Sequence, residues 1–216
     1  MAARAGGFSA AAGLAPLRYG AVDWGDYYNV GDLDLLLTGE DTNENRSAAL
    51  YETDGERLLL SARFLPSVSK SAADWGDYDH DGDLDLAIKG QSETEGSLQS
   101  HTLVFANDGL GSFEVIENEF IGLHNGEVLW GDYDQDGDLD VWASNRNAPR
   151  LRLLRKEIPK SGNFVNLSLI GNGTTTNRDA IGARVEIIAA SSESKNMPRS
   201  ISTLRAGEGF LSQSSK

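Results

Sequence analysis

Hydrophobic and polar residues alternate along three short stretches of the chain with a period of two, which is typical of β-strands. In the clearest stretch, Leu84, Leu86 and Ile88 alternate with Asp85, Ala87 and Lys89. The same alternation returns at residues 33–37 and 139–143. No segment has the longer period of an extended amphipathic helix. The pattern therefore predicts an all-β protein.

Each stretch is followed by signals for more strands. After the middle stretch, "HTLVFAND" (101–108) predicts a third strand, "DGLG" (108–111) a turn, and "SFEVI" (112–116) a fourth strand. The run "AALYETDGERLLL" from Ala48 gives a matching pair after the first stretch. Four short antiparallel strands in about 50 residues are typical of a propeller blade.

One segment is repeated three times in the chain, with a few substitutions. "VDWGDYYNVGDLDLLLTG", "ADWGDYDHDGDLDLAIKG" and "VLWGDYDQDGDLDVWASN" align without gaps from Val22, Ala73 and Val128. Their tryptophans, Trp24, Trp75 and Trp130, are 51 and 55 residues apart. Repeats of this period indicate a solenoid or a propeller. A β-sandwich with coincidentally similar hairpins is the alternative, and three matched blocks make it improbable.

These observations predict an all-β fold: a partial β-propeller of about two and a half to three four-stranded blades, followed by a small C-terminal β domain. The expected parts are 1–19, the last strand of a preceding blade; 20–70, a blade with a degraded acidic loop; 71–125, a blade with an intact loop; 126–160, a partial blade with an intact loop and a linker; and 161–216, the C-terminal domain. Closed propellers typically carry about 4–8 blades. We therefore expect a longer chain to supply the missing blades.

The net charge of the chain argues against some classes of binding partner. The chain has 216 residues and a net charge of −14, from 33 acidic and 19 basic residues. Nucleic acids and anionic membranes require cationic surfaces, so neither is an expected partner. No apolar run is long enough to span a bilayer, and the N-terminus does not read as a signal peptide. The chain has no cysteine, which excludes disulfides and thiolate metal sites.

The aspartates are concentrated in the repeated loops. Counting from Asp77 as position 1, one loop has carboxylates at positions 1, 3, 5, 7 and 9 and Gly82 at position 6. Alternating oxygen ligands around a sharp glycine turn suit Ca²⁺, with the backbone carbonyl of position 7 as a further ligand and the Asp83 side chain left beside the ion or in solvent. The predicted metal residues are Asp77, Asp79, Asp81, Asp83, Asp85, Asp132, Asp134, Asp136, Asp138 and Asp140.

An EF-hand loop, a Mg²⁺ site and a solvated turn are the alternatives to a Ca²⁺ loop of this kind. An EF-hand requires glutamate at position 12, where this chain has Ile88 and Ala143. Mg²⁺ is less suitable because it prefers strict octahedral geometry. A solvated acidic turn without an ion stays possible. It is the favoured interpretation for the first loop, which has Tyr28 and Val30 at positions 3 and 5. There the residues of a weak or lost site are Asp26, Asp32 and Asp34.

The repeated blocks resemble FG-GAP/VCBS repeats, the calcium-binding propeller blades of integrin α-subunit heads and of many secreted bacterial proteins. The resemblance covers roughly residues 6–155 and implies that D-x-D-x-D-G-x-x-D loops bind Ca²⁺ between the first two strands of a blade. The C-terminal part is similar to the ASPIC/UnbV domain, through "NRDAIGARV" (177–185) and "AGEGFLSQ" (206–213). The resemblance implies that this domain is truncated here, and it brings no catalytic residues.

The leading functional expectation is a non-enzymatic, calcium-stabilised module, extracellular or in the cell envelope, that mediates adhesion or binds a protein or glycan ligand. The alternative is the accessory or catalytic propeller of a secreted polysaccharide-active or lipase-like enzyme, for which no acidic pair outside the metal loops was found. His80, His101 and His124 have no partner at metal-ligand or triad spacing and are interpreted as surface or turn residues. The identical placement of the tryptophans favours packing between blades over sugar stacking.

Overall fold

The computed structural model describes residues 14–54, 57–62, 65–116, 120–134, 136–146, 150–156, 167, 169–178, 180, 183–188 and 199–203. Every regular element in these ranges is a β-strand, so the predicted all-β class is confirmed. The described residues include no helix that is long and apolar enough to cross a membrane.

The first two sheets are four-stranded and antiparallel, and each strand pairs with the next along the chain. The first sheet contains β1 (Val22–Gly25), β2 (Asp34–Glu40), β3 (Arg46–Asp54) and β4 (Arg57–Ala62). The second contains β5 (Ser69–Gly76), β6 (Asp85–Thr94), β7 (Ser97–Asn107) and β8 (Phe113–Val115). Four predicted strands per repeat are thus found in both, although β7 begins at Ser97 rather than at residue 101.

The third sheet has three strands in the order β11-β10-β9. They are β9 (Val128–Gly131), β10 (Asp140–Ser144) and β11 (Leu151–Leu154). A separate antiparallel pair, β12 (Arg184–Ile188) and β13 (Arg199–Thr203), follows. The predicted strand at 6–14 and the run 206–213 lie outside the described residues, except for Leu14.

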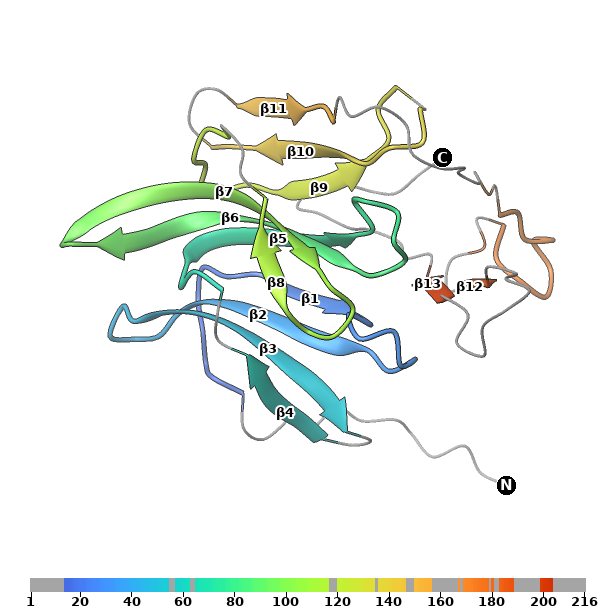
Figure 1. Ribbon diagram of the computed structural model, residues 1–216, viewed down its shortest axis with the longest axis horizontal. Helices are drawn as coiled ribbons and strands as arrows, with labels where there is room; N and C mark the ends of the chain where they lie inside the picture. Colours follow the sequence, from blue (N-terminus) through green and yellow to red (C-terminus); the bar gives the residue numbers. More distant parts are fainter. Residues whose placement is uncertain are drawn as a thin grey trace.

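The three sheets lie one above another, as Figure 1 shows from blue through green to yellow. One apolar cluster lies between the first two sheets and joins Leu36 and Leu50 to Leu86 and Ile88. A second cluster joins Ala87 of β6 to residues of β9 and β10. Alternate side chains of β6 therefore enter two different interfaces. Both faces of β6 are thus buried against neighbouring sheets, and the alternation does not mark a buried face and a solvent-exposed face.

The repeated tryptophan packs on the repeated glycine of the preceding sheet. A Cβ atom added to Gly25 would lie 2.9 Å from the Trp75 ring, and one added to Gly76 would lie 2.7 Å from the Trp130 ring. Tyr27 also stacks on Trp75, with ring centroids 6.0 Å apart and planes 5° from parallel. The predicted role of these tryptophans in packing between repeats is confirmed for Trp75 and Trp130.

A buried lysine ties the second sheet to the third. Lys89 of β6 is 0% exposed, and its Nζ donates to the carbonyl oxygens of Asn125, at 2.7 Å, and of Ser144. Burial lowers the pKa of Lys89 to about 8. Since the ammonium group satisfies backbone oxygens rather than a carboxylate, its role here is to hold two chain segments together.

Candidate metal centres

The three acidic loops, residues 26–34, 77–85 and 132–140, each run from the first strand of a sheet into the second. We number each loop from its first aspartate. The glycines at position 6, Gly31, Gly82 and Gly137, have φ values of 97°, 96° and 96°. This left-handed backbone favours glycine because a Cβ atom would strain it. The predicted sharp turn at position 6 is therefore present in all three loops.

The aspartate at position 1 holds the turn closed. In the first loop, Asp26 accepts hydrogen bonds from the backbone N–H groups of Val30 and Gly31 at 2.9 and 2.8 Å. In the third loop, Asp132 accepts them from Asp136 and Gly137 at 3.0 and 3.1 Å. These bonds connect position 1 to positions 5 and 6, so this aspartate shapes the loop whether or not an ion is bound.

The aspartate at position 9 anchors the loop to the third strand of its own sheet or to the residues just after that strand. Asp85 is 0% exposed and accepts hydrogen bonds from the backbone N–H groups of Asn107, at 2.9 Å, and Tyr78, at 2.6 Å. Asp140 likewise accepts from Lys156 and Tyr133, at 2.9 and 3.0 Å. The corresponding Asp34 accepts from the N–H of Thr53 at 2.9 Å, so the anchor occurs in all three repeats.

Carboxylate oxygens converge in two of the loops. One group consists of Asp77, Asp79 and Asp85, and in each group the candidate ligand atoms lie within 4.8 Å of one another. The other group consists of Asp132, Asp134 and Asp136. A set of hard oxygen donors with no nitrogen or sulfur suits a hard cation such as Ca²⁺. Either group could hold a metal ion.

The second loop combines converging carboxylates with a buried oxygen that lacks a hydrogen bond, whereas Asp34 Oδ2 of the first loop is also buried without one but belongs to no converging group among the described residues. Asp77 Oδ1 is buried and accepts no hydrogen bond from the residues described. Burial raises the pKa of Asp77 and of Asp79, and the neighbouring Asp81 raises both further. Burial also raises the pKa of Asp85 to about 7, despite its two N–H donors. A bound cation would supply the missing partner for Asp77 Oδ1 and would favour the ionised form of all three.

The remaining predicted ligands in these loops have other partners. Asp81 is exposed and accepts the backbone N–H of Asp83 at 2.9 Å. The Asp83 carboxylate accepts a hydrogen bond from the Asn29 side chain at 2.6 Å. Asp138 lies 3.0 Å from His80 and 3.5 Å from Lys156. Burial alone would raise the pKa of Asp138, but these two donors hold it below its usual range.

The third loop already has cationic neighbours. The Arg155 Nε atom lies 3.4 Å from Asp134 Oδ2, and Lys156 lies next to Asp138. Both loops have five aspartates, but the described ion pairs place no lysine or arginine on Asp77, Asp79 or Asp85, and Lys156 is only the weakest of the influences on the pKa of Asp79. The second loop is therefore the stronger of the two candidate metal centres.

The first loop keeps its shape without the converging carboxylates. Neither group of candidate ligands in the described part of the chain comes from this loop. Val30 is 68% exposed and Asp32 is also exposed. The Tyr28 ring packs against the second sheet, where a Cβ atom added to Gly111 would lie 2.4 Å from its hydroxyl. Of the loop's aspartates, Asp26 and Asp34 keep a structural role, because they accept hydrogen bonds from backbone N–H groups.

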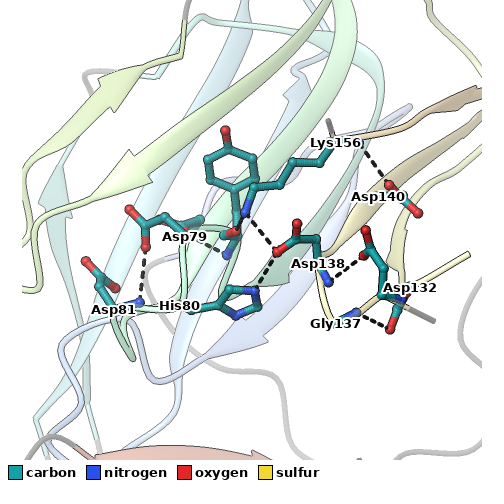
Figure 2. A network of polar contacts seen from close by, with 11 residues as sticks. Asp79, His80, Asp81, Asp132, Gly137, Asp138, Asp140 and Lys156 are labelled. Atoms are coloured by element: carbon teal, nitrogen blue, oxygen red, sulfur yellow. Dashed lines mark hydrogen bonds and ion pairs between the residues drawn. The ribbon is translucent and has the colours of Figure 1, made fainter. Parts of the chain in front are cut away.

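Sequence reasoning missed the contacts between loops. Figure 2 shows His80 of the second loop pointing at Asp138 of the third, with Lys156 on the same carboxylate. His80 does lie in a turn, as expected, but it has a carboxylate partner. Two further hydrogen bonds reach position 2 of the preceding loop. Lys156 Nζ donates to the Tyr78 carbonyl at 2.7 Å, and Asn107 Nδ2 donates to the Tyr27 carbonyl at 2.8 Å. The sequence offered one signal for the contact between loops: the residue at position 4 is polar in every repeat.

Comparisons with protein-family models, with curated proteins and with solved structures found no match to this chain.

Proposed function

We propose that this chain is a non-enzymatic calcium-binding module, built from propeller blades of the FG-GAP/VCBS kind, that works in adhesion or ligand binding outside the cell or in its envelope. Its partner would be an extracellular protein or glycan, and further blades would come from a longer chain. The ASPIC/UnbV-like segment would follow the blades as a separate β domain.

One observation carries the proposal. Asp77, Asp79 and Asp85 bring their carboxylate oxygens within 4.8 Å of one another, and Asp77 Oδ1 is buried without a hydrogen bond. Asp85 is buried, Asp77 is half-buried and Asp79 is exposed, and bringing like charges this close is costly unless a cation compensates them. Asp77 and Asp79 would bind Ca²⁺ directly in the second loop, with Asp85 already oriented by two backbone N–H groups. Asp132, Asp134 and Asp136 would bind it in the third.

The proposed role of calcium is to stabilise the folded repeats. An ion that binds only the folded state stabilises it, by about 2.7 kcal/mol when its concentration is 100 times the Kd. Extracellular calcium modules have Kd values on the order of 10⁻⁴–10⁻³ M. We therefore expect about 10 mM Ca²⁺ to raise the melting temperature by several degrees over the metal-free protein.

Thermal unfolding in EDTA, in Ca²⁺ and in Mg²⁺ tests this proposal. Asp79→Asn should lose a large part of the calcium-dependent increase, whereas Asp32→Asn, an exposed change in the first loop, should keep all of it. Mg²⁺ should give a smaller increase, because it requires stricter geometry. An equal melting temperature in EDTA and in Ca²⁺ would refute the proposal.

A further inference from the structure

Two contacts of the same kind join consecutive acidic loops. The residue at position 4 of one loop reaches position 7 of the next. Asn29 Nδ2 donates to Asp83 Oδ1 at 2.6 Å and to the Gly82 carbonyl at 2.8 Å. His80 Nε2 lies 3.0 Å from Asp138 Oδ1 (Figure 2). The partners are 54 and 58 residues apart in the chain, so the repeat itself creates both contacts.

The backbone at position 4 makes this reach possible. Asn29 and His80 have φ values of 55° and 65°, in the left-handed region that few non-glycine residues adopt. Asparagine tolerates this conformation better than most residues, and histidine is also enriched there. Both residues therefore take an unfavourable backbone conformation at the same loop position. In each case, the side chain lies on the next loop.

Position 7 is where such a contact would influence an ion. Its aspartate carboxylate is held by the preceding loop, together with Lys156 in the case of Asp138. Its backbone N–H is held within its own loop, by Asp81 for Asp83 and by Asp136 for Asp138. The carbonyl of position 7 is then left as the group that this residue can offer to the cation. A donor that orients a ligand residue from outside its site commonly changes metal affinity.

We infer that position 4 of each loop is a positioning residue for the metal site of the next loop, so that affinity is set from the preceding repeat. The first loop then has a function without binding an ion of its own, since it supplies Asn29 to the second loop. His80 serves the third loop in the same way. This inference rests on the proposed calcium binding, but the positioning contact itself exists without metal.

Calcium titration calorimetry on proteins with a single intact site tests the direction of the effect. Asp134→Asn leaves the second loop to be measured, and Asp79→Asn leaves the third. With only the second loop active, Asn29→Ala should weaken calcium binding on the order of 10-fold and His80→Ala should not. With only the third loop active, His80→Ala should weaken calcium binding and Asn29→Ala should not. His80→Asn, unlike His80→Ala, should keep the calcium affinity of the third loop, because asparagine performs this role in the first loop.

Amide hydrogen exchange in EDTA gives a readout without metal. Asn29→Ala should speed exchange at the Asp83 N–H and leave the Asp138 N–H protected, and His80→Ala should speed exchange at Asp138. If calcium binds but each position 4 change weakens only its own loop, the inference is overturned and the proposed function stands. If no variant binds calcium, the proposed function fails, and the exchange pattern alone decides whether position 4 orients the next loop.

Discussion

At the scale of single residues, the aspartates of one loop have different roles. Positions 1 and 9 bind backbone N–H groups and build the turn, as Asp26 and Asp34 do in a loop that lacks carboxylates at positions 3 and 5. Position 7 contacts the neighbouring loop. A buried carboxylate that accepts hydrogen bonds from fixed donors avoids part of the desolvation cost. The acidic motif therefore has an architectural role as well as a candidate metal-binding role.

Asp34 gives a test of this architecture that is independent of calcium. Burial raises its pKa from 3.8 to about 6. Between these values the folded state keeps a proton that the unfolded state loses, so stability falls as pH rises through this window and is constant above it. Asp34→Asn should remove the share of this fall that comes from Asp34, about 2–3 kcal/mol, and leave the shares of Asp77, Asp79 and Asp85, whose pKa values are also raised by burial.

The measurement is the free energy of unfolding by urea between pH 3.5 and pH 7 in EDTA. The slope with pH is compared, because the substitution also shifts absolute stability. Asp32→Asn, at an exposed position of the same loop, should keep the wild-type slope. If Asp34→Asn has the wild-type slope too, then Asp34 is ionised throughout, and the described burial does not govern its charge.

At the scale of strands and loops, one interface is used twice. Each pair of neighbouring sheets places the tryptophan of the later repeat on the glycine of the earlier one, at Gly25–Trp75 and Gly76–Trp130. Glycine is needed here for space rather than for backbone freedom. The interface also explains why tryptophan and glycine occur together in the repeated segment.

The glycines of the repeat provide a matched pair of variants. Gly76→Ala would place a methyl group 2.7 Å from the Trp130 ring, and overpacking of this kind typically costs about 1–3 kcal/mol. Gly131→Ala, at the same motif position, would meet Trp142 at 3.7 Å, an ordinary contact, and should cost little. Denaturant unfolding of both variants checks the difference. Equal stability of the two would contradict the described packing.

The sequence predicted these elements well because the repeat is visible in it. Aligning the three segments was enough to assign the glycine turn at position 6 and to expect tryptophan packing between repeats, and the family resemblance implied that each loop joins the first two strands of a blade. The strand β11 had no such signal, since "LRLL" (151–154) is too short to show a clear alternation. Its existence follows from pairing with β10 rather than from local pattern.

Side-chain directions in the loops could not be predicted in the same way. Spacing places carboxylates at alternate positions, but it does not say which oxygens meet a backbone N–H, an ion or a neighbouring loop. The contact from Asn29 to Asp83 depends on the stacking of two sheets and on a left-handed backbone at position 29. Both properties belong to the folded chain and not to a single loop.

At the scale of the whole molecule, the net charge of −14 is partly a property of the loops. Two of these loops belong to neighbouring sheets and are joined through His80, Asp138 and Lys156. A divalent ion in each would reduce the negative charge where the sheets meet. The proposed calcium would thus stabilise the array of repeats as well as the individual loops.

Calcium stoichiometry by equilibrium dialysis tests this account most directly. The account predicts two ions per chain in the wild type, one in Asp79→Asn, one in Asp134→Asn and none when both changes are combined. Asp32→Asn should keep two, because the first loop has no converging carboxylates. A wild-type chain that binds no calcium, or a double variant that still binds two ions, would contradict the account.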